Sequence, residues 1–425
     1  MIQADNLYTY VVIFLAAVLA IYWIILYFGI NETRDQEDRA ELIMKGKYPS
    51  IAVLIPTIFE GERLRNTVEK AQKMDCPKNR YYIYVVLNAS TDKKTREVAK
   101  RLKNVRLIYA PFDGKSRVMN YALKKYIKQD LVLVLDADTL IERDLPKRLA
   151  SHFVDKEVGA TISSVQVYKP RTIIERLQKY EYLLSIMGRK ALSYLGGLMI
   201  AHGAGSMFRM SALKKVGYFD EKNYTEDMEI GLKLLTHGYK VDNSIPSVSY
   251  TVVPSNIRQL VKQRVRWFSG FYINLINYRK ALFSKKYGSL GMLVVPFMLI
   301  SIFLSFLVLG GIIYELIILI TPFYYSLINT SLGFTLQSFI GSISIFSVTT
   351  RDLLAILVTV VGLFSLFYSI ASVDSKKNIF RNTLGILIYI TFYSVFLSFI
   401  WLYSLILVAV TRKGAGWSLN TKSSS

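Results

Sequence analysis

The sequence predicts an α/β domain with a mostly parallel sheet, joined to an α-helical transmembrane region. Two observations predict this fold class. Short apolar strands alternate with amphipathic helices in the charged middle of the chain, which is the pattern of a parallel sheet covered on both faces. Long apolar runs flank this segment on both sides, and 52% of the 425 residues are hydrophobic. Soluble cores do not need such runs, so we expect membrane helices.

The first half of the domain is expected to contain four strands and three helices. The strands are Ile51–Pro56, Tyr82–Leu87, Val105–Tyr109 and Leu131–Leu135, and the helices cover 61–74, 92–103 and 116–128. The second half is less regular, with a strand near 159–167, a helix near 171–191, a Gly-rich crossing at 196–205 and a helix over 226–237. Thr225 is the predicted cap of that last helix.

The apolar runs set the predicted domain boundaries. Residues 8–30 carry no charge and are long enough to span a bilayer, and the lack of a preceding basic segment favours a retained anchor over a cleaved signal peptide. The expected parts are an N-terminal transmembrane helix (1–30), a cytosolic domain (31–253), amphipathic interface helices (254–286), C-terminal transmembrane helices (287–411) and a basic tail (412–425). Basic residues after the first span place the domain in the cytosol of a multi-pass membrane protein.

Charge and cysteine content exclude several classes of protein. The net charge is +22, concentrated in the middle segment. Nucleic-acid binding is one interpretation of this surplus. Attraction to an anionic leaflet and to anionic small ligands is favoured instead, because membrane spans flank the segment, so we expect membrane lipids and no nucleic acid as partners. One cysteine and three histidines exclude an internal disulfide and a Cys/His zinc cluster.

Two aspartates follow the fourth predicted strand, where ligands of parallel sheets bind. Asp136 and Asp138 are separated by one residue. Their hard oxygen ligands suit Mg²⁺ or Mn²⁺, which usually takes one or two protein carboxylates and completes its shell with phosphate oxygens. Turn chemistry at the end of a strand is the simpler explanation of such a pair.

Two further short motifs lie later in the chain. Glu226 and Asp227 open a predicted helix, where a fixed carboxylate can act as a general base, although helix capping alone also favours acids there. Gln263, Arg266 and Trp267 share one face of a later helix. The indole offers a flat surface to a sugar ring and the guanidinium can clamp a phosphate. A basic interfacial helix is the alternative explanation of Gln263, Arg266 and Trp267, the third motif in chain order.

With these motifs in order, residues 49–270 resemble the family 2 glycosyltransferases of the GT-A fold, which has a Rossmann-like sheet. The membrane-integrated branch of cellulose, chitin, hyaluronan and poly-N-acetylglucosamine synthases is the most similar. The opening P-x-x-N-E loop of the family corresponds to residues 56–60, with Phe59 in place of asparagine. Its V-V-D-D-x-S-T-D segment corresponds to residues 85–92, with Leu87 and Asn88 in place of the two acids that meet the nucleobase. Its G-K-x-x-x-L-N element begins at Gly114.

The resemblance implies a role for each matching residue. Nucleotide-sugar binding falls to Thr57, Glu60, Asn88, Lys115 and Asp136. Asp138 becomes the metal ligand, and Asp227, with Glu226 beside it, becomes the catalytic base. Gln263, Arg266 and Trp267 become the site for the acceptor and the diphosphate.

We therefore predict an inverting, metal-dependent glycosyltransferase that uses a nucleotide-sugar of the UDP-sugar class to extend and translocate a polysaccharide. The alternative is a lipid glycosyltransferase similar to ceramide glucosyltransferase, which adds one sugar to a membrane lipid. A non-enzymatic membrane scaffold with a degenerate site is the third hypothesis, and the intact Asp138, Asp227 and Arg266 argue against it.

Overall fold

The structure is a computed structural model that describes residues 48–341 and 383–411, together with residues 13, 14, 16 and 17 and a few positions between 353 and 368. The predicted N-terminal helix and its charged connector, apart from those four helical residues, lie outside the described residues. The same is true of the basic tail over 412–425.

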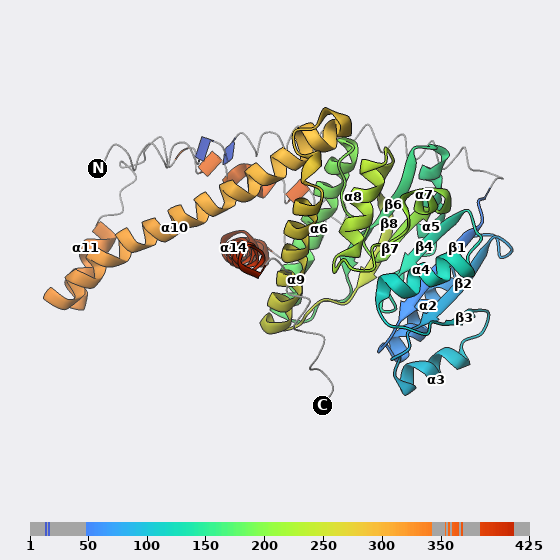
Figure 1. Ribbon diagram of the computed structural model, residues 1–425. Helices are drawn as coiled ribbons and strands as arrows, with labels where there is room; N and C mark the ends of the chain where they lie inside the picture. The colour runs from blue at the N-terminus through green and yellow to red at the C-terminus, as the bar shows by residue number, and fades with distance from the viewer. Residues whose placement is uncertain are drawn as a thin grey trace.

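The four predicted strands form the parallel half of an eight-stranded sheet, whose order is β3-β2-β1-β4-β7-β6-β8-β5 (Figure 1). The four are β1 (Ile51–Thr57), β2 (Tyr81–Leu87), β3 (Arg106–Tyr109) and β4 (Leu131–Leu135), and their neighbours pair in parallel. The crossovers are α2 (Glu62–Gln72), α3 (Lys93–Arg101) and α4 (Lys115–Lys125), as the sequence predicted. Asp92 caps α3 by accepting a hydrogen bond from the backbone N–H of Thr95.

The other half of the sheet is mixed, so the description as mostly parallel holds only for the first half. The strands β7 (Ala204–Arg209) and β5 (Leu140–Ile141) run antiparallel to their neighbours β4, β6 and β8, whereas β6 (Val158–Val167) and β8 (Lys240–Thr251) pair in parallel. The sequence predicted neither β5, β7 nor β8. Small and polar residues dominate β7 and β8, which hides the apolar alternation that marks a strand.

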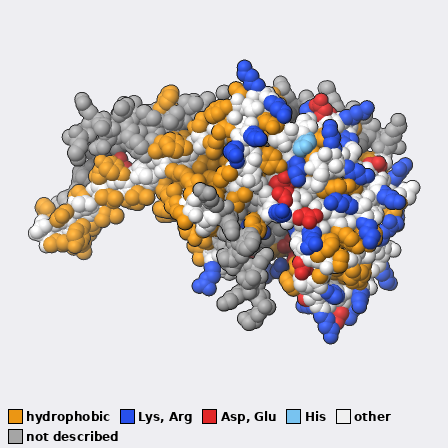
Figure 2. Space-filling model, viewed as in Figure 1, with side chains coloured by type: hydrophobic (Ala, Val, Ile, Leu, Met, Phe, Trp, Pro, Cys, Tyr) orange, Lys and Arg blue, Asp and Glu red, His pale blue; other side chains and the backbone are white. Residues whose placement is uncertain are grey.

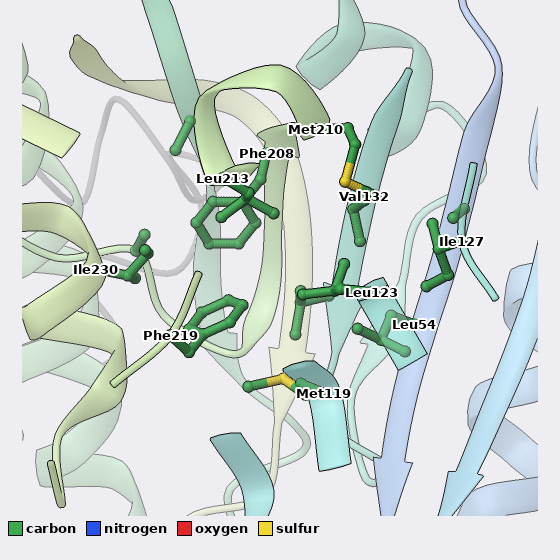
Figure 3. Packing of buried hydrophobic residues seen from close by; sticks show 14 of the residues in the cluster. Leu54, Met119, Leu123, Ile127, Val132, Phe208, Met210, Leu213, Phe219 and Ile230 are labelled. Atoms are coloured by element: carbon green, nitrogen blue, oxygen red, sulfur yellow. The ribbon is translucent and has the colours of Figure 1, made fainter. Parts of the chain in front are cut away.

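Alternate residues of the central strands supply two separate cores. In β4, Val132 and Val134 pack with α4 and with Phe208, while Leu131, Leu133 and Leu135 pack into the cluster on the opposite face. This is the two-residue period of a strand buried on both faces. Figure 3 shows the first cluster, in which Met119 and Leu123 of α4 lie against Leu54 and Val132. The cores fix the carboxyl ends of β1 and β4, where the polar motifs begin.

Three helices lie beyond the mixed half of the sheet, and the last two of them carry the later motifs. They are α6 (Ile173–Tyr194), α8 (Glu226–Thr236) and α9 (Ile257–Asn277). Thr172 and Glu175 form a capping box at the start of α6, and Asn256 caps α9 by accepting from the N–H of Gln259. Shorter helices α5 (Leu145–Ser151) and α7 (Met210–Val216) connect the strands.

Two helices are long and apolar enough to cross a membrane by length and composition. They cover Leu290–Asn329 and Gly385–Thr411, with mean hydropathies of 2.8 and 2.2. The first comprises a π-helical turn (Leu290–Val294) and α10 (Val295–Asn329), followed by α11 (Leu332–Gly341). The second comprises α13 (Thr383–Ile388), the turn η8 (Tyr389–Tyr393) and α14 (Ser394–Thr411). Figure 1 shows α10 extending away from the sheet, and Figure 2 shows hydrophobic side chains gathered along it.

The second apolar segment is packed on the α/β domain. The indole of Trp401 in α14 stacks on Phe268 of α9, with ring centroids 3.9 Å apart, and meets Phe271 and Tyr272 edge to face. Such aromatic pairs stabilise a contact beyond the area they bury. The helix that carries the third motif therefore lies directly against an apolar helix.

Candidate active site

Lys115 joins the first two acidic motifs. It begins α4, Asp136 follows β4, and Glu226 begins α8. Lys115 Nζ lies 2.7 Å from Asp136 Oδ1 and 3.0 Å from Glu226 Oε1. Burial alone would lower the pKa of Lys115, but the two carboxylates raise it. The site thus holds a permanently charged ammonium group between two carboxylates, and a cation held in this way can also bind an anionic ligand.

Gly203 allows this cluster to form. Its carbonyl accepts a hydrogen bond from the backbone N–H of Asp136 at 2.9 Å. A Cβ at position 203 would lie 2.5 Å from Asp136 Oδ1 and 2.6 Å from Lys115 Nζ. Those distances are shorter than real carbon contacts, so a side chain at position 203 would force the Asp136 carboxylate or the Lys115 ammonium to move. The sequence predicted a Gly-rich crossing at 196–205 but did not indicate this role of Gly203.

Replacing Gly203 by alanine is expected to displace the Lys115–Asp136 pair and to weaken binding of a nucleoside diphosphate by about tenfold, the equivalent of about 1.4 kcal/mol. Titration calorimetry measures this directly. Gly333→Ala is the matched control, because a Cβ at position 333 meets nothing within 4 Å. Equal affinities in the two variants would contradict a ligand site at this cluster.

A second group of carboxylates surrounds Asp138. Burial, and then the charge of Asp136, raises the pKa of Asp138. Burial, and then the charge of Asp138, raises the pKa of Glu60. These carboxylates repel one another, so a cation placed among them would be favoured. Within the described ranges no three His, Cys, Asp or Glu side chains are grouped to hold a metal by themselves. The donor set fits Mg²⁺ or Mn²⁺, which needs only one or two carboxylates beside ligand phosphates.

Asp227 has the electrostatics of a general base. Burial, and then the charge of Glu226, raises its pKa to about 6, although Lys115 and Arg266 oppose the shift. Its Oδ1 accepts from the N–H of Met228 at 2.9 Å, and its carbonyl accepts from Ala201 N–H at 2.8 Å. The carboxylate is therefore fixed in place, and a raised pKa of this kind is what a general base at neutral pH requires.

Thr225 occupies the N-cap position of α8, as predicted, but its side chain does not cap the helix. Its hydroxyl makes no cap hydrogen bond. It accepts from Asn274 Nδ2 of α9 at 2.9 Å and also lies 3.3 Å from Asn223 Oδ1. Gly270 of α9 has no side chain, and a Cβ there would lie 2.3 Å from Thr225 Cγ2. The Thr225 side chain therefore contacts α9 instead of capping α8, and this contact holds the start of α8 against α9.

The predicted nucleotide loop has polar atoms without partners. Thr57 and Asn88 are buried at the ends of β1 and β2, and the N–H of Asn88 donates to the carbonyl of Thr57 at 3.4 Å. Within residues 48–341 and 383–411, Thr57 Oγ1 and Asn88 Oδ1 have no hydrogen-bond partner. Because an unpaired buried polar atom costs stability, these two atoms are candidate ligand contacts.

The third motif lies on α9, and it contains a residue that the sequence analysis missed. Arg266 is exposed, and its charge acts on Asp227 by lowering the pKa of that carboxyl. Arg264 is completely buried; it donates to Gln263 Oε1 at 2.5 Å, and its guanidinium carbon lies 4.2 Å from the centre of the Trp267 ring. Helical spacing offered a signal, since Leu260, Arg264 and Phe268 share the inward face of α9.

The fold and the site are those of a glycosyltransferase: a mixed sheet with carboxylates at its strand ends, the carboxylate of Asp227 nearby and a basic motif beside them. Residues 49–270 match the family model described as "Glycosyltransferase like family 2". The match covers more than half of the chain, so the chain belongs to this family, as the resemblance in the sequence predicted.

Curated relatives include two poly-beta-1,6-N-acetyl-D-glucosamine synthases. The one from Staphylococcus aureus (strain COL) is 26% identical over 267 residues, which is 61% of this chain and 64% of the relative. The one from Staphylococcus epidermidis is 28% identical over 264 residues, 59% and 62% of the two chains. The similarity thus spans less than two thirds of either relative.

Among solved structures, a mannosyltransferase from Pyrobaculum calidifontis in complex with GDP-Man and Mn²⁺ has a similar fold. The TM-score is 0.52 at 17% sequence identity, over 94% of this chain and 99% of the other. At this identity the similarity supports the fold.

Proposed function

We propose that the chain is an inverting glycosyltransferase that uses a nucleotide-sugar, of the UDP-sugar class, to extend a polysaccharide at a membrane. The observation that carries the proposal is the convergence of the acidic motifs: Lys115 joins Asp136 to Glu226, next to the fixed base Asp227. Family membership and the names of the curated relatives support the reaction class and the polymeric product.

We assign one group of side chains to the nucleotide-sugar donor and another group to the acceptor. Thr57, Glu60 and Asn88 line the loop for the nucleoside, and Asp136 and Lys115 lie where its phosphates would bind. Asp227 removes the proton of the acceptor hydroxyl as that oxygen attacks the anomeric carbon and the diphosphate departs. Arg266 is placed to stabilise the negative charge on the leaving diphosphate, and Gln263 and Trp267 hold the acceptor.

Asp138 is the residue that would hold the divalent cation, with Glu60 nearby. When bound, Mg²⁺ or Mn²⁺ would neutralise charge on the diphosphate. The raised pKa values of both acids support this assignment, because a cation would relieve the repulsion that burial and neighbouring carboxylates create.

A multi-pass membrane location with a cytosolic catalytic domain fits the two apolar helices and the basic surface of the domain. The stacking of Trp401 on Phe268 supports an acceptor site at the entrance to the apolar region. This contact is compatible with an emerging polymer, and also with a lipid acceptor that approaches along the helices.

The test is to incubate the purified chain with a panel of nucleotide-sugars and to size the radiolabelled product. Trp267→Ala is expected to shorten or abolish the polymer while donor hydrolysis to water persists, because a stacking surface for the acceptor sugar is lost. Val252→Ala, an exposed apolar position, is the control. A wild-type product that carries one sugar and partitions into organic solvent would identify a lipid glycosyltransferase instead.

A further inference from the structure

Arg264 belongs to a cluster that connects three parts of the chain. Its Nη2 lies 2.7 Å from Glu181 Oε2 of α6, and the same Glu181 oxygen accepts a hydrogen bond from the Tyr393 hydroxyl at 2.7 Å. Tyr393 lies in η8, within the second apolar segment. The buried guanidinium of the third motif is therefore linked, through one carboxylate, to the apolar C-terminal helices.

The other contacts of Arg264 decide how two motif residues are presented. The amide oxygen of Gln263 accepts from Arg264, which fixes the amide so that its NH₂ group is the part available to a ligand. The guanidinium lies against one face of the Trp267 indole, so at most the opposite face is available to a sugar. A displaced Arg264 would release both side chains at once.

Packing alone does not account for an arginine at this position. The neighbouring inward positions of α9 are apolar, namely Leu260, Val265 and Phe268. An apolar residue would fill the same space without the desolvation that a buried ion pair requires. The distinctive property of Arg264 is that it contacts two residues of the acceptor motif and an anchor on α6 together.

We propose that Arg264 is a positioning residue for the acceptor site, held in place by Glu181 and Tyr393, so that the C-terminal helices are coupled to the orientation of Gln263 and Trp267. The inference rests on the proposed function, because it assumes that these two side chains bind the acceptor. It specifies an acceptor oxygen that receives a hydrogen bond from the Gln263 amide, as a sugar hydroxyl does.

The first experiment separates positioning from stability. Removing one partner of a buried ion pair strands the other charge, whereas replacing both by apolar residues is often tolerated. The full chain carrying Glu181→Leu and Arg264→Met together is assayed for transfer to an oligosaccharide and for donor hydrolysis. We expect a chain that stays folded and hydrolyses donor, with KM for the oligosaccharide raised about tenfold or more.

A second buried cluster provides the matched control. Glu229 accepts from the Tyr278 hydroxyl at 2.8 Å and pairs with Lys233 at 3.1 Å, so it repeats the combination of carboxylate, cation and tyrosine away from the third motif. Glu229→Leu with Lys233→Met is expected to leave KM for the oligosaccharide unchanged. Equal KM values in the two double variants would overturn the positioning role.

A readout independent of activity tests the coupling to the C-terminal helices. The emission of Trp267 is isolated by subtracting the spectrum of the Trp267→Phe counterpart from that of each variant. Tyr393→Phe, which removes the hydroxyl that donates to Glu181, is expected to shift this emission, whereas Tyr278→Phe, which removes the hydroxyl that donates to Glu229, is not. An unshifted spectrum in Tyr393→Phe would refute the coupling. This result stands even where the wild-type chain transfers no sugar, an outcome that refutes the proposed function alone.

Discussion

Asp227→Asn is expected to lower the rate of glycosyl transfer by at least about 100-fold, within the range that a lost general base costs. The amide cannot take up the proton of the acceptor hydroxyl. Its oxygen can still accept from the N–H of Met228, as Asp227 Oδ1 does at 2.9 Å, so the local structure should persist. Calorimetric titration with a nucleoside diphosphate should therefore give nearly unchanged affinity.

The pH dependence provides an independent check on the same residue. The pKa of Asp227 is raised to about 6, so the carboxylate is ionised and active above that pH and becomes protonated below it. The value of kcat/KM should fall as the pH is lowered through about 6, and the residual rate of the asparagine variant should lack this limb. Asp220→Asn, in the preceding loop, serves as the control. An Asp227→Asn enzyme that keeps more than half of the wild-type turnover would remove Asp227 from the mechanism.

Asp138→Ala is expected to abolish most of the metal dependence of donor binding. If Asp138 provides the protein ligand, nucleoside diphosphate should bind the wild type at least about tenfold more tightly with Mn²⁺ than without it, and the variant should lose that difference. Calorimetry with and without the metal measures both affinities. Because calorimetry measures binding alone, an effect of the substitution on the chemical step does not change the result.

Asp144→Ala is the appropriate control for this measurement. Asp144 lies six residues after Asp138, and its carboxylate already pairs with Arg148 at 2.7 Å. It should retain the full metal dependence. Equal metal dependence in Asp138→Ala and the wild type would show that other groups hold the cation.

The sequence predicted the parallel half of the sheet because its strands are buried on both faces. Continuous apolar runs such as Leu131–Leu135 are typical of strands that are buried on both faces, so their positions could be predicted. The mixed half of the sheet was harder to predict from the sequence. The strand β8 contains Asn243 and several serines that are buried and form hydrogen bonds with other elements, as Ser249 does with Ser163 at 2.7 Å. Such hydrogen bonds depend on the tertiary structure, so composition gives no sign of them.

The candidate site was also predicted only in part. Motif order identified Asp136, Asp138, Asp227 and Arg266 through their resemblance to a family. It did not indicate that Lys115 bridges two of the motifs, or that Gly203 makes room for it, since both depend on segments that meet only in the folded chain. Arg264 was overlooked because an arginine in a basic helix is normally assigned to the surface, and only its partner Glu181 explains its burial.

The helix over Leu290–Asn329 has a consequence for the membrane around the protein. Its 40 residues extend about 60 Å, twice the roughly 30 Å of a hydrocarbon core. Even a tilt of about 40°, the upper end of the usual range, leaves about 46 Å along the bilayer normal. Inserted, this helix must protrude from one leaflet or thicken the lipid around it. Tyr324 and Tyr325 lie near its end, where tyrosines commonly mark the interface between lipid and water.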